Sequence, residues 1–76
     1  MIVVFKVREE ELFEALEKLE KLFHPRQITE VERATSLGSE RTLWYTIIVS
    51  TAYDPPELLR RLKEHGLLEY LACIKR

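Results

Sequence analysis

The stretch Arg41-Thr42-Leu43-Trp44-Tyr45-Thr46-Ile47-Ile48-Val49-Ser50-Thr51, followed by Asp54-Pro55-Pro56-Glu57, decides the fold. Its first part consists mainly of β-branched and aromatic residues, which strands favour. Its second part begins a helix. We expect Asp54 to be the N-cap, Pro55 to take the first helical position, where its missing N–H costs nothing, and Glu57 to complete a capping box. The segment therefore predicts a strand over residues 41–51 and a helix from Pro55.

The residues after this segment complete that helix and add a strand. Gly66 is expected to end the helix in the left-handed conformation, with Leu67 packed back on Leu62. A last strand is expected over roughly residues 68–75. The apolar face of the helix comprises Leu58, Leu59 and Leu62, and that of the strand comprises Leu68, Tyr70, Ala72 and Ile74.

The residues before the segment predict a strand, a helix and a second strand. Residues 2–7 are apolar and β-branched, as in a central strand. Residues 9–23 change to helical spacing, and Pro25 ends that helix. Residues 27–36 suit an edge strand with charged side chains, and residues 37–40 a hairpin turn. The expected helical stripe comprises Leu12, Leu16, Leu19 and Phe23, widened by Phe13, Ala15 and Leu22.

The order of these elements is β-α-β-β-α-β, which defines the fold class. We expect an α+β ferredoxin-like sandwich, in which a four-stranded antiparallel sheet carries two helices on one face. The first and third strands lie in the middle of such a sheet. Residues 1–76 are interpreted as a single ferredoxin-like domain, so one face of its sheet is left uncovered.

The uncovered face is the candidate interaction surface. The more uniformly apolar set of each central strand should face the helices, which leaves Ile2, Val4, Trp44 and Ile48 on the other side, with Lys6 at the border. These four are the predicted interface residues. The inverted parity, with Trp44 in the core and Tyr45 outside, remains an alternative because a one-residue slip exchanges the two faces. Either parity predicts an open face short of charge.

Composition narrows the class of protein. The chain has 76 residues, 12 Lys and Arg against 13 Asp and Glu, and a single cysteine. A core this small without disulfides often gains stability by oligomerising. The near-neutral charge provides no basic footprint for nucleic acid or an anionic membrane. The absence of Asn and the excess of Glu, Lys and Arg are typical of thermophile proteins. No apolar run or leader sequence stands out, so we expect a cytoplasmic protein.

No pattern in the sequence predicts catalysis, a metal site or a cofactor, and we expect a non-enzymatic protein. His24 and His65 are expected to cap helix C-termini, where a partly charged imidazole is favoured. Cys73 is alone and is expected to be a small buried apolar residue. The acidic run at residues 9–11 is interpreted as a solvated helix start. The basic residues Arg60, Arg61 and Lys63 are interleaved with glutamates, as on a solvated face.

At the level of element order and length, the whole chain resembles the ACT domains and the effector domains of Lrp-type regulators. The likeness lies in the opening strand at residues 2–7 running into an acidic helix, the strand at residues 43–51, and the turn into residues 55–65. The resemblance implies a regulatory module that dimerises through sheets or edges and binds a small metabolite at the interface. Ligand-binding ACT domains tend to have a glycine after the first strand, where this chain has Arg8-Glu9-Glu10, so no ligand site is carried over.

Two functions are therefore expected, in order. The first is a small interaction or regulatory module that forms a homodimer through its sheet, with a small-molecule effector as an additional partner. The alternative is a single-stranded RNA-binding domain that stacks bases on Trp44 and Tyr45 of the open face. RNA-recognition motifs carry further aromatics on the first and third strands, which this chain lacks. An acylphosphatase needs an asparagine, and the sequence contains none.

Overall fold

The computed structural model describes residues 1–35 and 43–75 of the chain. The main elements are β1 (Ile2–Arg8), α1 (Leu12–Leu22), β2 (Ile28–Thr35), β3 (Leu43–Ser50), α2 (Pro55–Glu64) and β4 (Leu71–Lys75), joined in part by the 3-10 turns η1 (Glu9–Glu11), η2 (Pro25–Gln27) and η3 (Leu68–Tyr70). The turn predicted at residues 37–40 lies outside the described residues. The observed class is α+β, as predicted.

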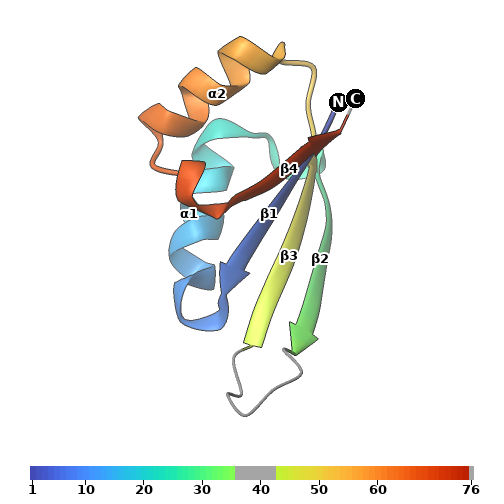
Figure 1. Ribbon diagram of the computed structural model, residues 1–76, viewed down its shortest axis with the longest axis vertical. Helices are drawn as coiled ribbons and strands as arrows, with labels where there is room; N and C mark the ends of the chain where they lie inside the picture. Colours follow the sequence, from blue (N-terminus) through green and yellow to red (C-terminus); the bar gives the residue numbers. More distant parts are fainter. Residues whose placement is uncertain (36–42, 76) are drawn as a thin grey trace.

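The four strands form one antiparallel sheet in the order β2-β3-β1-β4. β1 and β3 are its central strands, and β2 and β4 are its edges. Both helices lie on the same side of the sheet (Figure 1). The other side is covered by no helix of the described part of the chain, so this sheet has one packed face and one open face.

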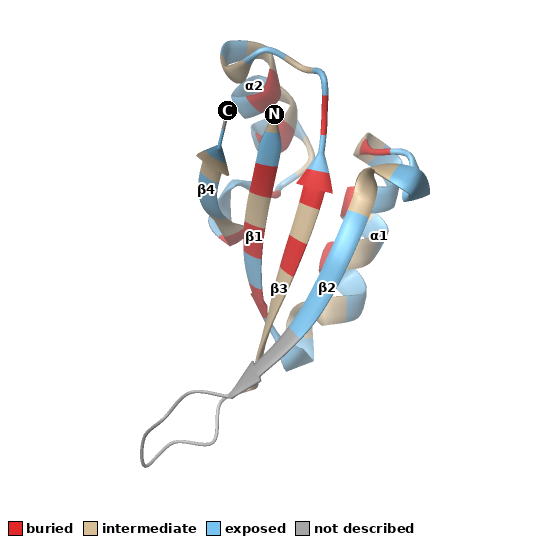
Figure 2. Ribbon diagram, turned by 90° about the vertical axis from the view of Figure 1, so that its right-hand side faces the viewer, coloured by how far each residue is buried: buried red, intermediate tan, exposed pale blue. Residues whose placement is uncertain are grey.

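The core lies between the packed face and the two helices. On β1 and β3 the buried residues alternate with more exposed ones, which Figure 2 shows as separate bands. Burial of a side chain of this kind contributes roughly 1.5–3 kcal/mol. The fully buried residues are Val3, Phe5, Val7, Ala15, Leu19, Ile47, Val49, Leu58, Leu62 and Leu67. The parity predicted for the two central strands is therefore confirmed, and the inverted parity is wrong.

The end of α2 also follows the prediction. Gly66 has φ +68°, a conformation that costs a residue with a Cβ atom more than it costs glycine. The backbone N–H of Leu67 donates to the carbonyl of Leu62 over 2.8 Å, and both side chains are fully buried. The cap thus returns the chain into the core immediately after the helix.

The start of α2 differs from the prediction. Asp54 is the N-cap residue, but its side chain makes no capping hydrogen bond. The Glu57 carboxylate is used elsewhere, since its Oε1 accepts hydrogen bonds from Nε and Nη2 of Arg61, one turn further along α2. A capping box needs Glu57 to reach back toward the N-cap, so this ion pair competes with it.

The last strand is shorter than predicted, and the side chains that it directs toward the core differ from the predicted set. Residues 68–70 form the turn η3, and β4 begins at Leu71. A register shift opposite Val4 and Phe5 lets both Leu71 and Ile74 face the core, although strict alternation would place residues three positions apart on opposite faces. Tyr70 is buried, and this burial raises the pKa of its hydroxyl to about 12. Strict alternation along residues 68–75 misses this bulge.

Phe13 was expected to widen the core face of α1, and this is wrong. Its side chain is 83% exposed, whereas Ala15 and Leu19 of the same helix are completely buried. The stripe that packs on the sheet is narrower than the apolar pattern because a helix presents only part of its circumference to one sheet. Phe13 therefore lies on the outer face of α1.

The two phenylalanines Phe5 and Phe13 allow a matched test of this core. We expect Phe5→Leu to lower the free energy of unfolding by about 1–2 kcal/mol, because it leaves a cavity in a closed core. Phe13→Leu should change it by less than about 0.5 kcal/mol. Urea unfolding followed by Trp44 fluorescence measures both, and equal effects of the two substitutions would contradict this arrangement.

Candidate functional site

The open face is built by the outward side chains of β1 and β3. Val4 pairs with Ile48, and Ile2 lies two residues from Val4 on the same face. Residues directly opposite in an antiparallel pair have their side chains side by side. Ile2, Val4 and Ile48 therefore form one patch, the apolar cluster, in which Ile2 is 44% exposed and the other two are half-buried.

Trp44, the fourth predicted interface residue, is on the same face but apart from this cluster. It pairs with Arg8, and the pair of Lys6 with Thr46 lies between it and the apolar cluster. The guanidinium carbon of Arg8 is 5.3 Å from the centre of the Trp44 ring. Such a cation–π contact contributes about 0.5–1 kcal/mol at an exposed site. The structure thus joins three of the four residues and places Trp44 at one end of the face.

The edge strands add charge to this face. Glu30 is paired with Ile48 and Glu32 with Thr46, which places both glutamates of β2 on the open side. Lys75 of β4 is paired with Ile2 at the opposite edge. The expectation of a face short of charge is therefore wrong, because it considered the central strands only. The register shift between Ile28 and Glu30 turns both glutamates outward.

The charges on the open face are separated by sign. The β2 edge carries Glu30 and Glu32, whereas the exposed side chains of Lys6 and Arg8 on β1 and of Lys75 on β4 are positive. The apolar cluster lies on the central strands, and Lys6 and Arg8 follow it along β1. The open face therefore has an acidic edge at β2 and a basic edge at Lys75 of β4, with the apolar cluster between these two edges.

The two glutamates of β2 interact with each other. The pKa of Glu30 is raised, first by a hydrogen bond with the Glu32 side chain and then by repulsion between the two carboxylates. Neighbouring carboxyl groups on one strand face resist simultaneous ionisation. The acidic edge thus concentrates negative charge, and a nearby cation would reduce the repulsion between its two carboxylates.

Cys73 also lies on this side of the sheet, opposite Val4. Its thiol is exposed, so the expectation of a buried cysteine is wrong. Cys73 alternates along β4 with Ile74, which packs against the core, so the cysteine side chain lies on the open side. The only cysteine and the only tryptophan of the chain are therefore both reporters of the open face.

The histidines have capping positions, one of them different from the prediction. His65 is the C-cap residue of α2, as expected. His24 instead caps the start of η2. Its side-chain Nδ1 accepts a hydrogen bond from the backbone N–H of Arg26 over 3.2 Å, and its backbone N–H donates to Oε1 of Gln27 over 2.7 Å. An imidazole that accepts at Nδ1 is unprotonated at that nitrogen.

Two basic residues of α2, Arg60 and Arg61, are paired with glutamates. Arg61 Nη2 is 3.0 Å from Glu57 Oε1, and Arg60 Nη1 is 3.2 Å from Glu64 Oε1. The Arg61 guanidinium also lies 4.7 Å from the centre of the Tyr53 ring. This surface is a solvated face with its charges neutralised locally, as the interleaved sequence predicts.

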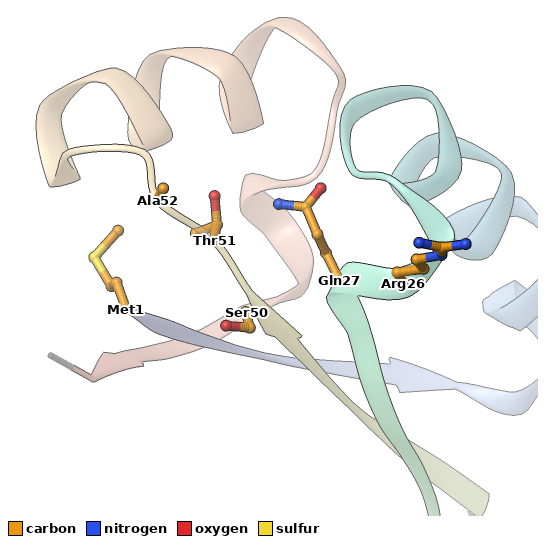
Figure 3. Close-up of a pocket in the computed structure, with 6 residues that line it drawn as sticks. All are labelled: Met1, Arg26, Gln27, Ser50, Thr51 and Ala52. Carbon is orange, nitrogen blue, oxygen red and sulfur yellow. The ribbon is translucent and has the colours of Figure 1, made fainter.

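A hollow of about 460 Å³ opens at the end of the sheet where β3 leaves it (Figure 3). Met1, Arg26, Gln27, Ser50, Thr51 and Ala52 line it. Thr51 is held there by two hydrogen bonds: its N–H donates to the Met1 carbonyl, and its Oγ1 accepts from the N–H of Tyr53. Arg26 is the only charged side chain of the lining, so the hollow specifies no ligand class.

Within residues 1–35 and 43–75, no group of three or more His, Cys, Asp or Glu residues could hold a metal ion. In the same residues, no helix has the length and apolar character needed to cross a membrane. Comparison with protein-family models, curated proteins and solved structures finds no match for this chain.

The interaction of Glu30 with Glu32 should make the folding stability depend on pH. A raised pKa in the folded state means that Glu30 stabilises the folded protein only while its carboxyl group is neutral. This stabilisation is fully present below the pKa of Glu30 in the unfolded chain, and it is lost as the pH rises through the pKa in the folded protein. Glu30→Gln should therefore raise the urea midpoint at pH 7, and this advantage should disappear below about pH 4.5. The measurement is made on monomeric protein at low concentration.

The matched control for this prediction is Glu20→Gln, which removes an exposed carboxylate of α1. It should leave the midpoint at pH 7 unchanged. A Glu30→Gln variant that is no more stable than wild type at pH 7 would show that the two carboxylates do not repel each other.

Proposed function

We propose that this protein is a small non-enzymatic interaction module of the ferredoxin-like class, which self-associates as a homodimer through its open sheet face. One observation supports this most: the apolar cluster of Ile2, Val4 and Ile48 lies in the middle of a sheet face that neither helix covers. An antiparallel sheet with one solvated face usually carries polar residues there. Exposed apolar patches rimmed by charge mark interaction surfaces.

Energetics favour a reversible dimer. Two copies would bring six partly exposed aliphatic side chains together, for a gain on the order of 6–9 kcal/mol. Association costs about 4–15 kcal/mol in lost translational and rotational freedom. The gain and the cost are of similar size, so the polar contacts around the apolar cluster decide the affinity. A micromolar Kd requires about 8 kcal/mol of net free energy, so these polar contacts must supply most of it.

A regulatory role is part of the proposal. The ACT and Lrp-type modules that this chain resembles in element order suggest that a small metabolite binds at the dimer interface. A module that dimerises weakly responds to such a ligand, because a ligand that binds only the dimer shifts the equilibrium by mass action.

Binding of single-stranded RNA on the same face is less well supported. Trp44, Lys6 and Arg8 would suit base stacking and phosphate contact. However, Glu30 and Glu32 lie beside them on the same face and would repel phosphates, and Arg8 already lies against the Trp44 ring. Quenching of Trp44 fluorescence by an oligonucleotide at low salt would favour this alternative over self-association.

Charge insertion into the apolar cluster tests the proposal. Ile48→Glu should convert the dimer to a monomer, because it would bury an unpaired carboxylate against the partner. Light scattering coupled to size exclusion at high micromolar concentration measures the mass, and Trp44 remains as a probe of folding. A wild-type protein that is monomeric in this range contradicts the proposal.

The control is Phe13→Glu, at the exposed phenylalanine on the outer face of α1. It makes the same apolar-to-charged change at a more exposed side chain outside the sheet, so the variant should keep the wild-type mass. A dimer that survives Ile48→Glu and is lost in Phe13→Glu would move the interface from the sheet to the helix.

A further inference from the structure

The separation of charge on the open face restricts how two copies can pack. Glu30 and Glu32 are on the edge strand β2, whereas Lys75 is on the other edge strand, β4, with Lys6 and Arg8 on the adjacent strand β1. In one protomer Glu30 and Lys75 are separated by β3 and β1, or three strand spacings of about 4.8 Å each. These two residues therefore belong to opposite edges and do not pair within one chain.

A symmetric dimer that packs two sheets face to face has its two-fold axis between the sheets. Sheets that pack in the aligned manner keep their strands within about 30° of each other. Two arrangements then remain. An axis perpendicular to the strands places β2 over the partner's β2, and an axis parallel to the strands places β2 over the partner's β4.

These two arrangements differ in electrostatic energy. With β2 over β2, four glutamate side chains of the two copies meet, and the basic edges meet as well. With β2 over β4, the acidic edge of each copy faces the basic edge of the other, and the contact occurs twice by symmetry. Complementary potentials favour the second arrangement, and like charges placed together disfavour the first.

We infer that the homodimer packs its open faces with the two-fold axis parallel to the strands, so that the acidic edge of each copy, with Glu30 and Glu32, faces the edge strand of the other that carries Lys75. This inference rests on the proposed function. β1 then lies over the partner's β3, which brings the two apolar clusters together at the centre. Aligned sheets are about 10 Å apart, a separation that the long side chains of Lys and Glu span.

The same arrangement accounts for the carboxyl pair. Glu30 and Glu32 lie on the same face of β2, and a hydrogen bond between their side chains, followed by repulsion between the carboxylates, raises the pKa of Glu30. Lysine ammonium groups from the other copy would relieve this repulsion in the dimer. Repulsion within the acidic edge destabilises the monomer, and its relief by the partner's lysines stabilises the dimer. Such a difference is expected of a surface used for recognition.

A charge-swap cycle tests the orientation. Glu30→Lys and Lys75→Glu should each weaken the dimer by roughly tenfold, because each change places like charges together at two symmetric contacts. The double variant Glu30→Lys/Lys75→Glu restores opposite charges and should return to within about threefold of the wild-type Kd. Sedimentation equilibrium at low salt measures the four constants, and circular dichroism verifies that each variant is folded.

The four dissociation constants distinguish a two-fold axis parallel to the strands from one perpendicular to them. Recovery in the double variant supports the parallel axis, since Glu30 and Lys75 do not meet inside one protomer. Single reversals without effect, or a double variant as weak as the two singles combined, overturn it; the proposed function still holds if Ile48→Glu dissociates the dimer. A monomeric wild type overturns both. As a matched control, Glu20→Lys on α1 makes the same charge change away from the sheet and should leave the Kd unchanged.

Discussion

The antiparallel pairing of β1 with β3 is the constraint on which the rest of the structure depends. Its register places Val3, Phe5 and Val7 opposite Val49, Ile47 and Tyr45, and it places the residues between them on the other face. Two short helices cover the first set and form the core. A chain of 76 residues has no further helix to cover the second set among its described residues. The open face is therefore a direct consequence of the pairing that builds the core.

Much of this arrangement can be predicted from the sequence, because the relevant signals are local. The alternation along β1 and β3 predicts which side chains are buried, and Gly66 marks the end of α2 by its positive φ. The residues that sequence reasoning misplaced depend on non-local geometry. Phe13 has helical spacing to the core residues of α1, but it is exposed because the sheet contacts only a narrow stripe of the helix.

The composition of the open face shows the same limit. Its apolar centre follows from the two central strands, whereas Glu30 and Glu32 reach it through the register shift in β2. Lys75 and Cys73 lie on it by simple alternation with the inward Ile74 of β4. A one-residue bulge changes the side to which a strand's residues point, and no turn or proline in the sequence marks the bulge in β2. The acidic edge is therefore the part of the open face that is least predictable from the sequence, because a bulge decides the side on which Glu30 and Glu32 lie.

The central claim is that this face is covered by a second copy of the chain. An isotope-filtered NOE experiment on a mixture of labelled and unlabelled protein detects contacts between copies only. We expect intermolecular NOEs between the methyl groups of Val4 and Ile48, at the concentration where light scattering gives the mass of a dimer. Intermolecular NOEs confined to the outer faces of α1 and α2, with none from Val4 or Ile48, would contradict it.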